Sequence, residues 1–149
     1  ADVSSVPVID ARMICAVAFQ GRVSCFDLGA GNLIWARDIS SAAGLSIDSR
    51  YVYVADDQGA VHALDKASGA SIWKQDKLFL RRLTAPLASG GLVAVADVQG
   101  VVHLLSRDDG SFAARLSTDG KPVVAPLQRI GKNLLVQTSG GGLYAIEAQ

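Results

Sequence analysis

The stretch "GAVHALDKASGASIW" at residues 59–73 decides the fold, because the chain contains close copies of it. "GRVSCFDLGAGNLIW" occupies residues 21–35, "GVVHLLSRDDGSFAA" occupies residues 100–114, and the shorter "GGLYAIEAQ" occupies residues 141–149. The leading glycines of the four copies are Gly21, Gly59, Gly100 and Gly141. Their spacings of 38, 41 and 41 residues are typical of propeller blades and of helical solenoids.

The local pattern favours strands over helices. The run before each leading glycine is short, rich in β-branched and aromatic residues and bounded by turn residues, as in "RYVYVAD" at residues 50–56. A second such run follows the glycine, which predicts a hairpin closed on a residue able to take positive φ. Pro7, Pro86 and Pro126 mark the start of a further strand, a position where proline is tolerated.

A turn after the hairpin predicts a fourth, outer strand that ends at a tryptophan. The recurring residues are Asp27, Gly31 and Trp35 in the first copy, Asp65, Gly69 and Trp73 in the second, and Gly110 in the third. Each tryptophan is expected to pack against the adjoining blade, which stabilises the fold by at most roughly 4–6 kcal/mol. Trp73→Ala should therefore impair folding. In the third copy Ala114 takes the tryptophan position, and we expect Phe112 to substitute imperfectly.

Four antiparallel strands per copy predict an all-β fold, a β-propeller segment of four blades whose last blade lacks its outer strand. The expected domain is one partial propeller over residues 1–149, with blades at about 3–40, 43–80, 83–117 and 122–149. Propellers usually have 4–8 blades and close by sharing a strand between the chain ends. We expect this segment to belong to a larger ring whose other blades lie on the N-terminal side.

Composition excludes several classes of function. The 149 residues include 14 basic and 14 acidic side chains and are half apolar, so no charge pattern predicts binding to nucleic acid or to an anionic membrane. No apolar run approaches the ~20 residues of a membrane-spanning helix. The start of the sequence lacks the pattern of a secretory signal.

The repeat resembles the propeller repeats named after pyrroloquinoline quinone, and within that group the BamB family of the outer-membrane β-barrel assembly machine. The stretches that carry the resemblance are "DVSSVPV" (2–8), "GRVSCFDLGAGNLIWARDIS" (21–40), "GAVHALDKASGASIWKQDKLFLRRLTAPL" (59–87) and "GLVAVADVQGVVHLLSRDDGSF" (91–112). The run from Trp73 through "LFLRRLTAPL" to the third copy, which lacks the tryptophan, is more particular to the BamB family than the repeat motif is.

The resemblance implies a non-enzymatic scaffold: an eight-bladed ring at the periplasmic face of the outer membrane of a Gram-negative bacterium, of which this chain would be the C-terminal half. The implied partner is the set of periplasmic domains of BamA, with no cofactor, metal or small-molecule substrate. The implied lipid anchor would lie outside this sequence. A BamA-contacting surface of the family includes a D-x-D pattern, at which Asp2 matches the first acid and Ser4 replaces the second.

An enzyme is the alternative, because quinoprotein dehydrogenases share these repeats. Their chemistry needs a catalytic aspartate, calcium ligands and a vicinal disulfide, and none of these can be matched here. The paired acids Asp56-Asp57 and Asp108-Asp109 lie beside glycines, where aspartate favours turns. A periplasmic quinoprotein-type enzyme or a ligand-binding propeller therefore stays the second hypothesis, which a thermal shift on adding the quinone and calcium would favour.

His62 and His103 occupy equivalent positions, three residues after the leading glycines. Equivalent positions in neighbouring blades could converge on a metal, but Ser24 and Tyr144 stand at the other two positions. We therefore interpret both histidines as ordinary strand residues.

Cys15 and Cys25 fall nearly opposite each other on the first hairpin. A disulfide is possible in an oxidising compartment, but the geometry across paired strands is often unfavourable. The sequence interpretation is a buried pair of thiols.

Two surfaces could bind other proteins. The stretch "KLFLRRL" at residues 77–83 is read as a packing strand between blades with two surface arginines, and its composition also suits an interface. An open segment exposes apolar blade faces at both ends, so two copies could pair face to face.

Overall fold

A computed structural model describes residues 5–17 and 21–148, and the regular elements of these residues are all β-strands. The first sheet contains β1 (Val8–Asp10), β2 (Met13–Val17), β3 (Val23–Asp27) and β4 (Leu33–Arg37). The second contains β5 (Leu45–Ile47), β6 (Tyr51–Ala55), β7 (Val61–Asp65) and β8 (Ser71–Gln75). The third contains β9 (Leu87–Ser89), β10 (Leu92–Ala96), β11 (Val101–Ser106) and β12 (Phe112–Ser117). The fourth contains β13 (Gln128–Ile130), β14 (Asn133–Gln137) and β15 (Leu143–Glu147).

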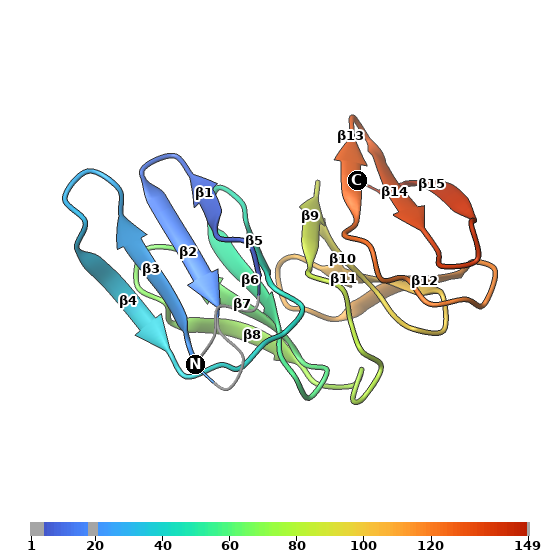
Figure 1. Ribbon diagram of the computed structural model, residues 1–149, viewed down its shortest axis with the longest axis horizontal. Helices are drawn as coiled ribbons and strands as arrows, with labels where there is room; N and C mark the ends of the chain where they lie inside the picture. The colour runs from blue at the N-terminus through green and yellow to red at the C-terminus, as the bar shows by residue number, and fades with distance from the viewer. Residues whose placement is uncertain (1–4, 18–20, 149) are drawn as a thin grey trace.

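Each sheet is an antiparallel meander, in which the strands pair in chain order (Figure 1). The fourth sheet has three strands and no counterpart of β4, as the truncated fourth copy predicts. Within the described ranges no helix is long and apolar enough to cross a membrane. The repeat therefore corresponds to one small sheet per copy.

The sheets follow one another around a common side. The first strand of each sheet contacts the first strand of the next, from β1 to β5, β5 to β9 and β9 to β13. Figure 1 shows these short strands gathered together, while β4, β8 and β12 lie toward the periphery. This radial arrangement is that of β-propeller blades, and the predicted fold class is confirmed.

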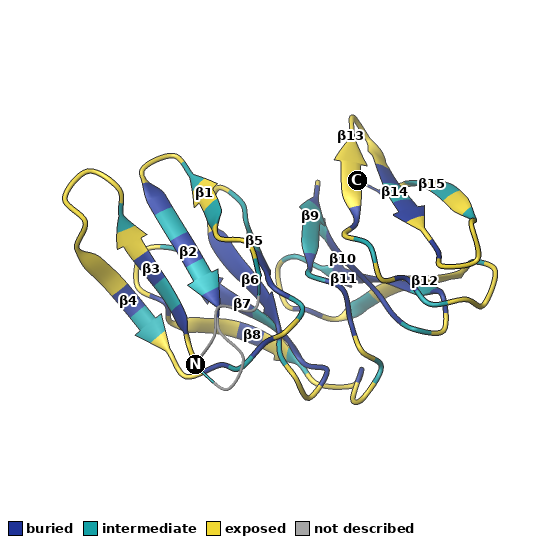
Figure 2. Ribbon diagram, in the orientation of Figure 1, coloured by how far each residue is buried: buried dark blue, intermediate teal, exposed yellow. Residues whose placement is uncertain are grey.

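Three apolar clusters fill the spaces between neighbouring sheets. In β6 the whole strand is buried: Val52 and Val54 pack toward the first sheet, while Tyr51 and Tyr53 pack toward the third (Figure 2). Successive strand residues point to opposite faces, so a sheet covered on both sides reads as a continuous apolar run. A blade therefore buries both of its faces only where it lies between two neighbours.

The outer strands differ from the prediction in one respect. Trp35 and Trp73 lie in the middle of β4 and β8 and do not end them. A register irregularity precedes each tryptophan, because Trp35 pairs with Cys25 while Leu33 pairs with the adjacent Phe26. Such a bulge turns the following side chain onto a chosen face.

Phe112 does not substitute for the missing tryptophan, so that expectation is wrong. Phe112 pairs with Leu105 and packs toward the second sheet, whereas Ala114 pairs with Leu104 on the other side of the irregularity and is exposed. Leu104 and Leu105 are adjacent on β11 and point to opposite faces. Because the irregularity lies between them, Phe112 and Ala114 lie on opposite faces of the sheet although they are two residues apart.

The two cysteines form a disulfide, so the interpretation as free thiols is wrong. Cys15 on β2 is the direct register partner of Cys25 on β3, with Cα atoms 4.1 Å apart. Both side chains are fully buried. The close pairing brings the sulfurs together, which is the geometry that the sequence alone did not show.

Candidate protein-interaction site

The predicted partner-binding residues Asp2 and Ser4 lie outside the described residues. The other predicted positions belong to the blade repeat, and Gly21 lies just before β3 in the first sheet. The remaining leading glycines close the hairpins with positive φ, which is 91° at Gly59, 77° at Gly100 and 88° at Gly141. Glycine takes this conformation without steric cost.

The recurring tryptophan of one blade packs on the recurring glycine of the next. A Cβ atom added to Gly69 would lie 2.5 Å from Cδ2 of Trp35, and one added to Gly110 would lie 2.4 Å from Cε3 of Trp73. The indole Nε1 of Trp35 donates to the Lys66 carbonyl at 2.9 Å, and that of Trp73 donates to the Arg107 carbonyl at 2.8 Å. The tryptophan of one blade and the glycine turn of the next thus form a packing contact between the two blades.

The aspartate of the same turn holds the turn closed. Oδ1 of Asp27 accepts from the Gly29 amide at 2.7 Å, and the Gly31 amide donates to the Asp27 carbonyl at 2.8 Å. Oδ2 of Asp65 accepts from the amide and the hydroxyl of Ser68. These hydrogen bonds lower the pKa of both carboxyl groups. The role of these residues is backbone support.

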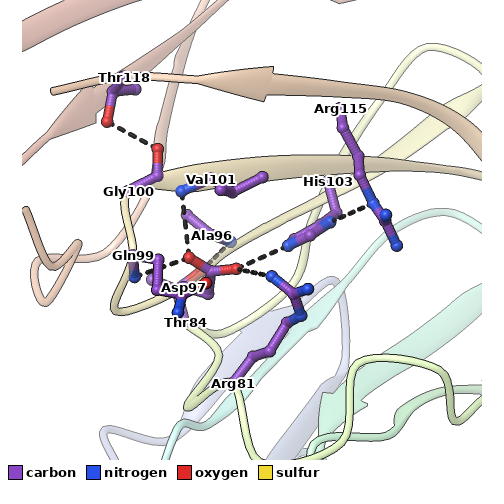
Figure 3. Close-up of polar contacts among 10 residues, drawn as sticks. All are labelled: Arg81, Thr84, Ala96, Asp97, Gln99, Gly100, Val101, His103, Arg115 and Thr118. Atoms are coloured by element: carbon purple, nitrogen blue, oxygen red, sulfur yellow. Dashed lines mark hydrogen bonds and ion pairs between the residues drawn. The ribbon is translucent and has the colours of Figure 1, made fainter. Parts of the chain in front are cut away.

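A buried network surrounds His103 in the third sheet (Figure 3). His103 and Asp97 are fully buried, and Nε2 of His103 lies 2.8 Å from Oδ2 of Asp97. Nε of Arg115 donates to Nδ1 of His103 at 3.1 Å, and Nη1 of Arg81 donates to Asp97 at 3.2 Å. Because an arginine Nε–H can only donate, Nδ1 of His103 must accept, and the ring proton lies on Nε2.

This network sets the charge of both groups. Burial lowers the pKa of His103, although the neighbouring Asp97 carboxylate opposes that shift. Burial by itself would raise the pKa of Asp97, but hydrogen bonds led by that from His103 outweigh it and lower the pKa. A neutral imidazole therefore faces an ionised carboxylate, and neither is accessible to a substrate.

The second sheet repeats the pair, since Nε2 of His62 lies 2.7 Å from Oδ2 of Asp56. In the fourth sheet Thr138 stands at the aspartate position and donates to Asp119 at 2.6 Å. The sequence interpretation missed these pairs. Their signal is an aspartate six residues before a histidine across a glycine-closed hairpin. Each histidine–aspartate pair links the two strands of its hairpin. His62 on β7 and His103 on β11 are therefore strand residues with a structural role, as interpreted from the sequence.

Of the paired acids, Asp56 and Asp109 bond to their local backbone as predicted, whereas Asp57 bonds to a distant connection. Asp57 accepts from the Ser40 hydroxyl and from the Ala42 amide, so it ties the β6–β7 turn to the β4–β5 connection. Asp109 accepts from the amide and hydroxyl of Ser111. Across residues 5–17 and 21–148 no group of three His, Cys, Asp or Glu side chains could hold a metal ion.

The segment 77–83 is a series of turns between β8 and β9, so the prediction of a strand there is wrong. Leu78 and Leu83 are buried, whereas the Phe79 and Leu80 side chains between them are 61% and 67% exposed. The backbone at Leu80 and Arg82 has φ of 59° and 53°, which no strand adopts. Arg81 is drawn inward to Asp97, so only Arg82 is a surface arginine as predicted.

Comparison with known proteins places the chain in a family. The family described as "Outer membrane protein assembly factor BamB" matches residues 1–75. A protein of that name from Bordetella pertussis is 48% identical over 148 residues, which are 99% of this chain and 38% of the relative. The chain therefore spans well under half the length of this curated relative.

Solved structures agree on the fold. BamB from Moraxella catarrhalis matches with a TM-score of 0.91 and 26% identity over 99% of this chain and 44% of its own. A quinohemoprotein alcohol dehydrogenase from Comamonas testosteroni matches with a TM-score of 0.64 and 22% identity over 77% of this chain and 21% of its own, a likeness of fold alone. With the matched repeat and the radial sheets, these comparisons show that the chain belongs to the BamB family of outer membrane protein assembly factors.

Proposed function

We propose that this chain acts as a non-enzymatic scaffold in outer-membrane protein assembly and binds the periplasmic domains of BamA. The observation that carries the proposal is the 48% identity to a protein named as an outer membrane protein assembly factor, extending over 99% of this chain.

The polar interior supports a scaffold over an enzyme. Catalytic groups must reach a substrate, whereas His103 and Asp97 are fully buried and bond to each other, to Arg81 and to Arg115. The equivalent His62 and Asp56 also bond to each other. These four groups are satisfied inside the protein, so they stabilise its fold and are not free to act as an acid or a base.

The disulfide supports a periplasmic location. Cys15 and Cys25 are bonded and fully buried. Structural disulfides persist in oxidising compartments such as the periplasm. We therefore propose the periplasmic face of the outer membrane as the site of action.

Two further expectations remain proposals: the blade limits of 3–40, 43–80, 83–117 and 122–149, and a ring of eight blades.

The pairing of two copies through their end blades is also a proposal. The outward sides of the end blades carry exposed apolar side chains, including Ile9 on β1 and Leu143 on β15. Pairing of two copies would cover such surfaces. Light scattering that gives only the monomer mass at high concentration would exclude the pairing.

The test of BamA binding is a pulldown of this chain on the immobilised periplasmic domains of BamA, quantified by biolayer interferometry. We expect saturable binding that Asp2→Ala weakens, while Arg129→Ala, a change at an exposed residue, leaves it unchanged. Restoring the second acid with Ser4→Asp should strengthen binding. Absence of binding by this chain under conditions where a full-length family member binds would contradict the proposal.

A thermal-shift measurement separates the scaffold from the enzyme. Pyrroloquinoline quinone with calcium should leave the melting temperature unchanged. A saturable increase would instead favour a quinoprotein, because a ligand that binds only the folded state stabilises it.

A further inference from the structure

The disulfide of the first sheet lies between two blades. Cys15 on β2 and Cys25 on β3 are both 0% exposed. Residues alternate along β2 between buried and half-buried (Figure 2), so one face of the first sheet is fully covered and the other is not. The two cysteines lie on the covered face, in an apolar cluster to which the second sheet contributes Leu45, Val52, Val54 and Leu64.

Only the first hairpin is needed to bring the two sulfurs together. Cys15 and Cys25 are ten residues apart in the chain and are direct register partners in the pairing of β2 with β3. The side chains that cover them belong to β5, β6 and β7, which come later in the chain and form a different sheet. Local contacts form before contacts between distant residues, so the pair can meet before its cover is in place.

The cover decides when the bond can be made or broken. In thiol–disulfide exchange a thiolate must reach a disulfide sulfur, so the rate depends on access to the sulfurs. Neither cysteine is accessible while the second sheet packs on the first. Exchange therefore requires these two sheets to be apart.

The first sheet is joined to the rest of the described structure at one interface. That interface consists of the cluster around the disulfide and of Trp35, which lies on Gly69. The opposite face of the first sheet carries half-buried and exposed side chains, including Ile14 and Phe26. Blades stacked side by side contact only their neighbours, so separation at this interface is the smallest opening that exposes the sulfurs.

We propose that exchange with a disulfide-bearing oxidant makes the Cys15–Cys25 bond before the second sheet packs on the first, and that only separation of these two sheets exposes the bond again. One cysteine thiolate attacks the oxidant's disulfide, which gives a mixed disulfide and releases one oxidant thiolate. The second cysteine thiolate attacks the chain's sulfur in the mixed disulfide, closes the Cys15–Cys25 bond and releases the other oxidant thiolate. Two electrons pass to the oxidant, whose two thiolates take up the two protons that the cysteines lose.

The folding chain is thus a substrate for a dithiol oxidant, whereas the folded protein is not. Reduction of the folded protein is limited by the same opening of the first interface. Neither property depends on the binding of BamA, because both are read from the two thiols of this chain alone.

The first test follows reduction of the folded, oxidised protein by dithiothreitol. The thiols that appear are alkylated and counted by mass spectrometry. We expect reduction without urea to be at least about tenfold slower than reduction in concentrated urea. Reduction of the folded protein as fast as that of the unfolded chain would overturn the proposal.

Two matched variants locate the opening. Val54 and Val95 are fully buried and occupy equivalent strand positions, opposite His62 and His103. Val54 packs toward the first sheet, whereas Val95 packs between the second and third. Without urea, Val54→Ala should accelerate reduction by roughly threefold or more, and Val95→Ala should change the rate by less than about twofold. Equal acceleration by both variants would mean that only unfolding of the whole chain exposes the sulfurs, which contradicts the proposal.

The second test varies the order of oxidation and folding. The reduced, unfolded chain is diluted out of urea, and oxidised glutathione is added either at once or after the tryptophan fluorescence has reached its final value. We expect the bond to close at least about tenfold faster when the oxidant is present from the start. A reduced chain that never acquires the fluorescence of the folded protein would support the same order, because packing would then require the bond. Equal rates of closure in a reduced chain that has already folded would overturn the proposal.

Discussion

The indole of Trp73 lies against Gly110 of the next blade, so closely that a Cβ atom on Gly110 would lie 2.4 Å from Cε3. Trp35 and Gly69 repeat the arrangement one blade earlier. Two recurring residues that are far apart in the sequence, a tryptophan and the glycine of the next copy, thus contact each other. The contact explains why tryptophan and glycine recur together.

Gly110→Ala should destabilise the protein by about 2–4 kcal/mol, because the added methyl group overlaps the Trp73 ring and alanine is strained at φ of 74°. Gly31→Ala is the matched control. Gly31 occupies the equivalent turn of the first blade with φ of 73°, and no atom lies within 4 Å of its Cβ position. It should cost about 1 kcal/mol from the backbone alone. Urea unfolding measures both, and equal losses would show that the ring contact contributes nothing.

Trp73→Ala should lower the free energy of unfolding by about 3–5 kcal/mol, since it opens a cavity between the second and third blades and leaves the Arg107 carbonyl without its donor. Ile72→Ala on the same strand is the control, because Ile72 is 43% exposed. It should cost less than about 1 kcal/mol. Comparable losses in chemical denaturation would contradict the central place of the tryptophan.

Stability should fall when the pH is lowered from 7 to 5. The pKa of His103 in the folded protein lies below its ordinary value of 6.5, so below that pH the unfolded chain takes up a proton that the folded protein excludes. The stabilisation is complete above pH 6.5 and is lost as the pH falls, with a slope no steeper than about 1.4 kcal/mol per pH unit for one proton. Asp97, whose pKa lies below 3.8, adds a second loss only in stronger acid.

His103→Gln should remove the first of these two losses. The glutamine side chain does not titrate in this range, so the stability of the variant should change less between pH 7 and pH 5. At pH 7 the variant should be less stable by about 1–3 kcal/mol, because the Asp97 network is left incomplete. A slope as steep as that of the unchanged protein would assign the acid sensitivity to other groups.

Reduction under denaturing conditions should raise the mass of the chain by about 2 Da, the two hydrogens gained when one disulfide opens. The free energy of unfolding should fall by about 2–3 kcal/mol, because the Cys15–Cys25 link no longer restricts the unfolded chain. The double variant Cys15→Ala with Cys25→Ala is the control and should not respond to reductant. An unchanged mass would show that the thiols are free.

Much of the fold could be predicted because the signals are local and repeated. The run at 50–56, the glycine at 59 and the turn from Asp65 to Gly69 each specify a strand or a turn through nearby residues. Repetition then places the turns and strands of one copy in register with those of the next. Because the fourth copy is shorter than the others, the sequence also predicted that the fourth sheet has three strands.

The rest depends on which residues meet across space. Sequence alone determined the class of fold, the four copies and the family resemblance. Only the tertiary structure decided that Cys15 faces Cys25 across a close strand pair, that a bulge turns Phe112 away from the tryptophan position, and that residues 77–83 form turns. Strand pairing and bulges decide on which face of the sheet each side chain lies. A shift of one residue in the pairing moves a side chain to the opposite face. These contacts therefore depend on the strand register, which composition does not reveal.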